Sequence, residues 1–271
     1  MNLLSPQYLD KQKVSQSFNR VASTYEQYAN IQKIVGNELL ERLQWLKIEP
    51  QQILDAGAGI SQLTRNLSSQ YQQANVYAVD IAPQMMIEFF KQVRTSNQFF
   101  ICADAAQLPF ADNSLDLIVS NLMLQWCNDI HAIFTEFKRT LKPDGALFFS
   151  TFGPDTLIEL RYSWAKADNG SHVNQFVDMH DMGDTLIKVG LTNPVMDVDM
   201  FQFTYSEIKL LMQELKQIGA HNIMAGRQRG LMGKSKFQAM LMAYEQYRSP
   251  EGLLPVTYEV VYGHALGKVT G

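Results

Sequence analysis

Five short runs rich in β-branched and aromatic residues follow one another along the middle of this chain, and stretches with helical spacing separate them. They span residues 53–55, 76–80, 99–102, 115–120 and 146–151. Nearly continuous apolar runs that alternate with helices are typical of a parallel sheet, because the crossover helices bury both faces of its strands. The pattern therefore predicts an α/β fold built on a mostly parallel sheet.

The segments on either side of these runs have other patterns. Residues 1–46 carry apolar side chains at helical spacing, which predicts a helical N-terminal cap. Residues 47–271 then form the main domain. Near its end, two further β-rich runs at 195–203 and 256–264 enclose a stretch of helical character, and we predict a helical insertion there at about 206–248.

Composition excludes several classes of protein. Of the 271 residues 46% are apolar, which is enough to bury a core. No run approaches the roughly 18 consecutive apolar residues of a membrane helix, and residues 1–20 lack the apolar centre of a secretory signal. The net charge of −4 argues against nucleic acid as a partner, since phosphates are neutralised by a basic face. We expect a cytoplasmic protein that acts on neither nucleic acid nor a membrane.

The cysteines and histidines show no ligand spacing. Cys102 and Cys127 lie far apart, and each stands within an apolar stretch. Buried free thiols fit this placement better than a disulfide or a zinc site. We therefore predict two buried free thiols and no metal.

A glycine-containing turn follows the first β-rich run, at Asp55-Ala56-Gly57-Ala58-Gly59. Such a turn lets the backbone approach a ligand closely, and the helix after it offers unpaired N–H groups. The third glycine of a dinucleotide-binding loop would fall at Gln62, where a side chain obstructs the packing of helix on strand. An acid before the glycines would also repel a pyrophosphate, but it suits a cationic ligand.

Two further acids follow the next two runs. Asp80 ends the second run, where a carboxylate accepts both hydroxyls of a ribose. Asp104 follows the third run, where a carboxylate can receive the amino group of an adenine. Three acids at successive strand ends describe a site for an adenosine with a positive, phosphate-free tail, which is S-adenosylmethionine. The predicted cofactor-binding residues are Asp55, Ala56, Gly57, Gly59, Asp80, Ile81, Asp104, Ala105 and Asn121.

Each of these motifs also has a purely structural interpretation. A lone Gly-x-Gly is an ordinary turn, and Asp80 or Asp104 can cap a helix. Their order and spacing together favour the cofactor site. With residues 108–110 and 141–147, they resemble the ordered motifs of class I S-adenosylmethionine-dependent methyltransferases over about residues 52–152. The resemblance implies a Rossmann-like, seven-stranded sheet that is mostly parallel, with an antiparallel last strand.

The flanking segments resemble one subfamily, the malonyl-acyl carrier protein O-methyltransferases of biotin synthesis. The resemblance covers nearly the whole chain and includes residues 14–32, 120–126, 152–161, 176–181 and 255–264. It implies methyl transfer to the free carboxylate of a malonyl thioester on acyl carrier protein or coenzyme A. A carboxylate with a pKa of about 4 is already ionised at neutral pH, so this chemistry needs alignment and exclusion of water but no base.

Several side chains then become candidates for the acceptor side. Tyr25 is a candidate to close over the cofactor near its methyl group, and Trp126 or Phe152 to border the sulfonium, with core packing as the alternative. An arginine holds a carboxylate with two parallel hydrogen bonds. The candidates for the malonyl carboxylate are Arg20, Arg161 and Arg227, each of which also fits simple surface solvation.

One segment differs in charge from the rest of the chain. Residues 206–240 hold six basic and two acidic side chains. Among them Arg227, Arg229, Lys234 and Lys236 are predicted to dock an acidic carrier protein, although a solvated face is the ordinary interpretation of such a run.

Two other functions stay open at this stage. A quinone-type or other small-molecule C- or O-methyltransferase shares the cofactor motifs, but such chemistry generally needs a base, and no acid–base pair stands out. A non-catalytic scaffold that binds an adenosyl ligand is the alternative from a different class.

Overall fold

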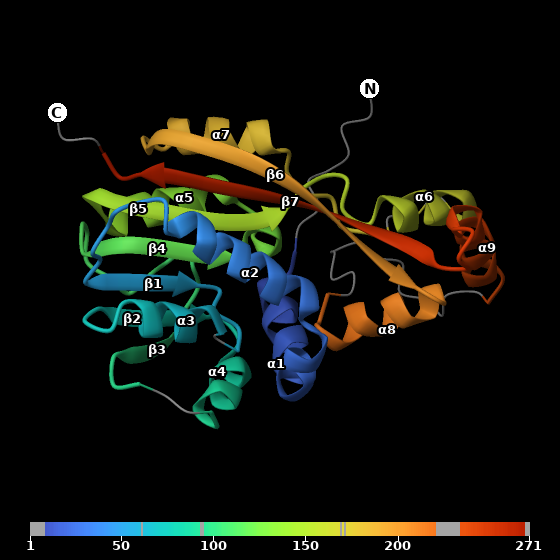
Figure 1. The fold of residues 1–271 in the computed structure, drawn as a ribbon, viewed down its shortest axis with the longest axis horizontal. Helices are drawn as coiled ribbons and strands as arrows, with labels where there is room; N and C mark the ends of the chain where they lie inside the picture. Colours follow the sequence, from blue (N-terminus) through green and yellow to red (C-terminus); the bar gives the residue numbers. More distant parts are fainter. Residues whose placement is uncertain are drawn as a thin grey trace.

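A seven-stranded sheet organises the computed structural model, which describes residues 9–60, 62–92, 95–168, 170, 172–220 and 234–268 (Figure 1). Its strand order is β3-β2-β1-β4-β5-β7-β6. The strands are β1 (Gln52–Ala56), β2 (Asn75–Asp80), β3 (Gln98–Cys102), β4 (Leu115–Asn121), β5 (Leu141–Phe152), β6 (Thr192–Tyr205) and β7 (Leu254–Leu266). Each predicted β-rich run lies in one of these strands.

The strand directions place several chain reversals at one edge of the sheet. Strands β1 to β5 pair in parallel, whereas β7 runs antiparallel to both β5 and β6. The predicted mostly parallel sheet with an antiparallel last strand is therefore confirmed. Because the carboxyl ends of parallel strands meet at the same edge, the segments that follow β1, β2, β3 and β4 are neighbours there.

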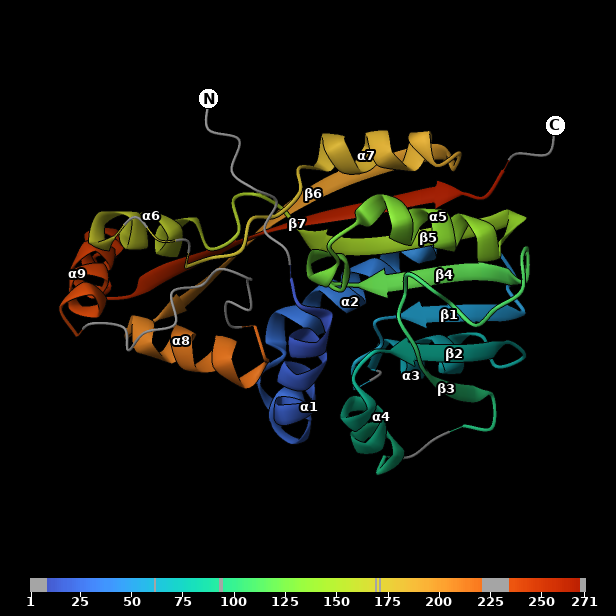
Figure 2. The same ribbon diagram turned by 180° about the vertical axis from the view of Figure 1, so that it is seen from behind.

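Helices cover both faces of the sheet, and further helices lie beyond its strand ends. The helices of the described residues are α1 (Lys11–Tyr28), α2 (Asn30–Leu43), α3 (Gln62–Gln70), α4 (Pro83–Phe90), α5 (Ile130–Thr140), α6 (Ile158–Ala167), α7 (Met179–Lys188), α8 (Ile208–Gln217) and α9 (Lys234–Tyr244). Figure 1 shows α2 and α3 in front of the sheet, and Figure 2 shows α5 on the opposite face.

Along the central strands successive apolar side chains point to opposite faces of the sheet, which explains why two separate cores form. Ile53 and Phe148 pack with apolar residues of α2 and α3, whereas their neighbours Leu54 and Phe149 pack with residues of α5 and α7. Successive side chains of a strand point to opposite faces, so an apolar run supplies both cores at once.

Two helices occupy the N-terminal segment, where the sequence predicted a helical cap. Asp10 caps the first of them by accepting hydrogen bonds from the N–H groups of Gln12 and Lys13. Ala29 then leaves the helical region, with ψ at 48°, and separates α1 from α2. As a result α1 lies at the carboxyl ends of β1 and β2, between α4 and α8, while α2 packs on the sheet (Figures 1 and 2).

Two helices also occur in the segment at about 206–248, where a helical insertion was predicted. Helices α8 and α9 lie between β6 and β7, and the long β6–β7 pair carries them, with α6, away from the rest of the sheet (Figure 1). Within the insertion, residues 221–233 lie outside the described part of the chain. No helix of the described residues is long and apolar enough to cross a membrane.

The prediction of two buried thiols is wrong for one of them. Both cysteines are free, but Cys102 is exposed and Cys127 is half-buried. Cys102 lies in β3, which is an edge strand and keeps much of its side-chain surface exposed. The apolar run at residues 99–102 is typical of a buried strand, but the strand order gives β3 a neighbouring strand on one side only.

Candidate active site

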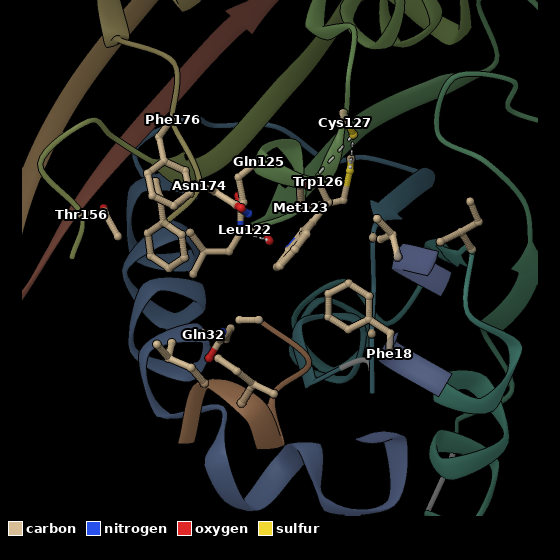
Figure 3. Close-up of a pocket in the computed structure, with 18 of the residues that line it drawn as sticks. Phe18, Gln32, Leu122, Met123, Gln125, Trp126, Cys127, Thr156, Asn174 and Phe176 are labelled. Atoms are coloured by element: carbon tan, nitrogen blue, oxygen red, sulfur yellow. Dashed lines mark hydrogen bonds between the residues drawn. The ribbon is translucent and has the colours of Figure 1, made fainter. Parts of the chain in front are cut away.

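A cavity of about 1530 Å³ opens at the carboxyl ends of β1 to β4 and extends to α6, α8 and α9. Residues from α1 and from the loops after the strands line one part of it. The other part is lined by β5, α6, the loop after α6 and the insertion helix α8. Figure 3 shows Phe18 and Gln32 on one side of this cavity and Leu122, Asn174 and Phe176 on the other.

The glycine turn after β1 adopts a backbone that favours glycine at two positions. Gly57 has φ at 76° and Gly59 has φ at 55°, both in the left-handed region. A Cβ atom on Gly57 would lie 2.2 Å from Cγ of Met123, whereas one on Gly59 would meet nothing within 4 Å. Both glycines line the cavity, so the backbone of this turn is open to a ligand. Ser61, which follows this turn two residues after Gly59, lies outside the described residues.

Asp55 lies behind this turn and not in the large cavity. Its carboxylate is 1% exposed and accepts a hydrogen bond of 2.6 Å from the Thr64 hydroxyl. Burial raises the pKa of Asp55 to about 7, and the nearby Asp80 carboxylate contributes to the increase. Asp55 lines a separate hollow of about 70 Å³, which Gly57 and Gly59 border as well. The Asp55 carboxylate is therefore separated from a ligand in the large cavity by the glycine turn, and it can influence that ligand only across the turn.

Asp80, by contrast, faces the large cavity together with Ile81. Its carboxylate accepts hydrogen bonds from the N–H groups of Gly59 at 2.8 Å and Ala82 at 2.7 Å. Burial raises the pKa of Asp80 despite these donors. The second predicted acid thus connects the glycine turn to the end of β2.

The third acid, Asp104, also lines the cavity, with Ala105 beside it. One of its oxygens accepts the Ala106 N–H, and the other pairs with the Lys11 ammonium at 2.5 Å. Sequence reasoning missed Lys11 because the two residues are 93 positions apart. The Asp10 cap locates the start of α1 in the sequence, but no local pattern shows which strand end that start will contact.

Two other predicted cofactor-binding residues, Asn121 and Ala56, form hydrogen bonds to other parts of the protein. Asn121 lines both hollows, donates to the Gln32 carbonyl at 2.9 Å and accepts from the Ser150 hydroxyl at 2.7 Å. It therefore ties the first turn of α2 to the end of β4. Ala56 lies in the core and lines neither hollow, and its carbonyl accepts a hydrogen bond from Ser120.

Aromatic side chains wall the cavity on the α1 side. Phe18 makes edge contacts with Trp126, at 5.2 Å between ring centroids, and with Tyr25 at 6.3 Å. Burial raises the pKa of Tyr25, so its hydroxyl stays protonated at neutral pH. On the far wall Phe152 contacts Phe176 at 5.7 Å. All five rings line the cavity and restrict the access of water to it.

The candidate arginines are not brought together by the fold. Arg20 is exposed, and Arg161 donates to the carbonyls of Pro154 at 2.6 Å and Thr156 at 3.0 Å. Neither is among the described residues that line the cavity. Arg227 and Arg229 lie outside the described part of the chain.

Three lysines supply the positive charge among the described residues around the cavity. Lys11 pairs with Asp104, Lys216 is exposed, and Lys236 pairs with Asp168 at 3.4 Å. Of the predicted carrier-docking residues, Lys236 therefore borders the cavity, and Lys234 is exposed at the start of α9. Within the described residues, no group of three or more His, Cys, Asp or Glu side chains is placed to hold a metal ion.

The residues present fit S-adenosylmethionine. Asp80 and Asp104 present carboxylates at successive strand ends, where a ribose and an adenine amino group require acceptors. The open glycine backbone lies between them and Asp55, whose charge suits a cationic tail. The cavity also exceeds the range of about 300–1,000 Å³ that is usual for one small ligand, so it has room for a second one.

The strand order, the glycine turn and the acids at the strand ends define the class I methyltransferase fold. The model of the family described as "Methyltransferase domain" matches residues 54–149. The fold is similar to that of the YcgJ protein of Bacillus subtilis, with a TM-score of 0.59 and 14% sequence identity, over 87% of this chain and 99% of that one.

Sequence comparison identifies one family within this class of methyltransferases. The chain is 46% identical over 267 residues to the malonyl-[acyl-carrier protein] O-methyltransferase of Laribacter hongkongensis, covering 95% of this chain and 90% of the relative. It is 39% identical over 254 residues to the biotin biosynthesis bifunctional protein BioHC of Cellvibrio japonicus, covering 94% of this chain and 50% of that protein. The chain belongs to the malonyl-[acyl-carrier protein] O-methyltransferase family, and it is a methyltransferase that uses S-adenosylmethionine.

Proposed function

We propose that this protein methylates the free carboxylate of a malonyl group held as a thioester on acyl carrier protein, in the cytoplasm, as an early step of biotin synthesis. The names of its relatives support this substrate. The structural observation that carries the proposal is the continuity of the cavity, which runs from the acid-bearing strand ends to the insertion helices. Cofactor and acceptor can therefore meet inside one continuous cavity.

In this proposal the cofactor occupies the part of the cavity next to the sheet. Asp80 accepts the ribose hydroxyls, and Asp104 accepts the adenine amino group beside Ile81 and Ala105. The turn at Gly57 and Gly59 approaches the methionine portion, with Ala56 and Asp55 behind it and Asn121 across from it. Lys11 pairs with the Asp104 carboxylate, so the adenine amino group would share that carboxylate with the Lys11 ammonium.

The reaction needs little acid–base help from the chain. The bound cofactor supplies a methyl group on a positively charged sulfur. A malonyl carboxylate oxygen forms a bond to that methyl carbon while the carbon–sulfur bond breaks, which leaves a neutral methyl ester and a neutral thioether. Because the carboxylate is ionised already, the protein has only to align it and keep water out. Phe18, Tyr25, Trp126, Phe152 and Phe176 are placed to do so.

The carrier protein is proposed to dock beside the insertion. Lys234 and Lys236 are at the start of α9, and Lys216 on α8 borders the same cavity. With Arg227 and Arg229 they would oppose the acidic surface of a carrier protein, which favours fast association. Arg20, Arg161 and Arg227 remain the candidates for holding the malonyl carboxylate, and coenzyme A remains the alternative carrier.

Mass spectrometry of the carrier protein tests the proposal. Malonyl-carrier protein incubated with enzyme and S-adenosylmethionine should gain the mass of one methylene. Acetyl-carrier protein, which has no free carboxylate, is the matched control and should gain nothing. A protein that methylates a quinol precursor and leaves malonyl-carrier protein unchanged would contradict the proposal, as would one that binds the cofactor and methylates neither.

A further inference from the structure

Two buried oxygens of the cavity wall have no hydrogen-bond partner. Among the described residues that line the cavity, these are Oε1 of Gln32 and Oδ1 of Asn174. A polar atom that is buried without a partner is unfavourable, because its bonds to water are lost and not replaced. Such an atom in the wall of a binding cavity is satisfied when a ligand brings the missing donor.

The two oxygens belong to different parts of the cavity. Gln32 is on α2 and also lines the small hollow with Asp55 and Gly57, on the side assigned to the cofactor. Asn174 lies across the cavity from it, beside Phe176 and in the loop between α6 and α7 (Figure 3). Asn174 is therefore on the acceptor side.

Contacts among the described residues hold the loop of Asn174 in place, and none of those residues donates a hydrogen bond to its Oδ1. His172 stacks on Trp164 with 3.9 Å between ring centroids, and it pairs with Asp168 at 2.7 Å. The lining of this part of the cavity mixes apolar side chains, such as Phe152, with polar ones, such as Thr156. An unpaired oxygen on an anchored loop selects for a ligand that has a donor at that position.

The chemistry of the proposed acceptor leaves one source for this donor. An ionised malonyl carboxylate, its methylene and its thioester carbonyl carry no N–H or O–H group. The arm that carries the thioester does, because an amide N–H follows the sulfur after a short methylene link. This arm is the same in acyl carrier protein and in coenzyme A.

We propose that Asn174 accepts a hydrogen bond from the amide N–H of the pantetheine arm and so determines specificity for thioesters that carry it. The proposal rests on the proposed function, since it assumes a malonyl thioester as acceptor. The bond fixes the arm along the cavity wall between β5 and α6. It thereby fixes how far the malonyl carboxylate reaches toward the cofactor.

Two short substrates test this assignment with the intact enzyme. One is the malonyl thioester of N-acetylcysteamine, which keeps the amide N–H. The other is its isostere, in which an ester oxygen replaces that N–H. The wild-type enzyme should prefer the amide substrate by about tenfold in kcat/KM, the size expected when a buried acceptor loses its donor. Asn174→Leu should remove this preference by lowering the amide value to that of the ester.

A matched variant and two binding measurements separate this role from a structural one. Gln32→Leu removes the other unpaired oxygen and should leave the amide-to-ester ratio as in the wild type. Asn174→Leu should bind S-adenosylhomocysteine as tightly as the wild type in calorimetry. It should also raise the Tm of the ligand-free protein, since it removes an unsatisfied buried atom. Asn174→Ala repeats the kinetic test without added bulk.

The outcomes distinguish this inference from the function on which it rests. If the wild type methylates both substrates equally well, or if both Asn174 variants keep the wild-type preference, the assignment of Asn174 is wrong and the proposed function stands. If the wild type methylates no malonyl thioester at all, the proposed function fails and the assignment fails with it.

Discussion

The glycine turn offers a quantitative test, because a Cβ atom added at its two glycines would meet different surroundings. Both have positive φ, at 76° for Gly57 and 55° for Gly59, so alanine costs about 1–2 kcal/mol in backbone strain at either position. At Gly57 the new Cβ would also lie 2.2 Å from Cγ of Met123, while at Gly59 it meets nothing within 4 Å. Overpacking of this kind adds about 1–3 kcal/mol.

Urea unfolding of the two variants at 25 °C measures the difference. Gly59→Ala should lose about 1–2 kcal/mol of unfolding free energy, and Gly57→Ala about 2–5 kcal/mol. Combining Gly57→Ala with Met123→Gly, which removes both the Cγ at 2.2 Å and the Cβ at 2.5 Å from the new methyl group, should recover the steric part, as a favourable interaction energy in the double-mutant cycle. Equal losses for the two glycine variants, or additive effects in the cycle, would refute the argument that close approach to Met123 requires glycine at position 57.

Three further predictions concern charge. Asp80→Ala should weaken binding of S-adenosylhomocysteine by about 10- to 100-fold in calorimetry, because hydrogen bonds to a charged group are lost; unchanged affinity would show that Asp80 does not hold the ribose. Asp55 keeps its proton up to a pKa of about 7 when folded but only to about 4 when unfolded, so the ligand-free protein should lose stability as the pH rises between these values. Thermal unfolding across this pH range should show a larger loss in the wild type than in Asp55→Asn, because the raised pKa of Asp80 contributes to the loss in both proteins, and parallel curves would contradict it. Arg227→Glu with Arg229→Glu should lower kcat/KM for malonyl-carrier protein much more than for malonyl-coenzyme A, whereas equal losses would exclude a docking role.

The strands of the sheet were predictable because their signals are local. The apolar runs at β1, β2, β4 and β5 supply side chains to both faces, and each run carries that pattern within a few residues. The positions of Asp80 and Asp104 on the cavity wall follow from the same reasoning. Acids that end parallel strands reach one edge of the sheet, whatever the rest of the chain does.

The substrate side of the cavity was less predictable. Arg161 is a candidate for the malonyl carboxylate because of its residue type, yet its guanidinium donates to the Pro154 and Thr156 carbonyls. Cys102 is exposed because β3 is an edge strand. In both cases the residue type was informative, but its surroundings depended on the order in which elements pack.

The sequence by itself determined the class of fold and placed Asp80 and Asp104 at strand ends that line one cavity, since periodicity, strand-end acids and turn residues act over short distances. Only the tertiary structure decided which side chains share the cavity. The pairing of Lys11 with Asp104 joins residues 93 positions apart, and the unpaired oxygen of Asn174 became visible only once the walls around it were assembled. Contacts of this kind form when segments that are distant in the sequence pack together, so a local sequence pattern does not predict them.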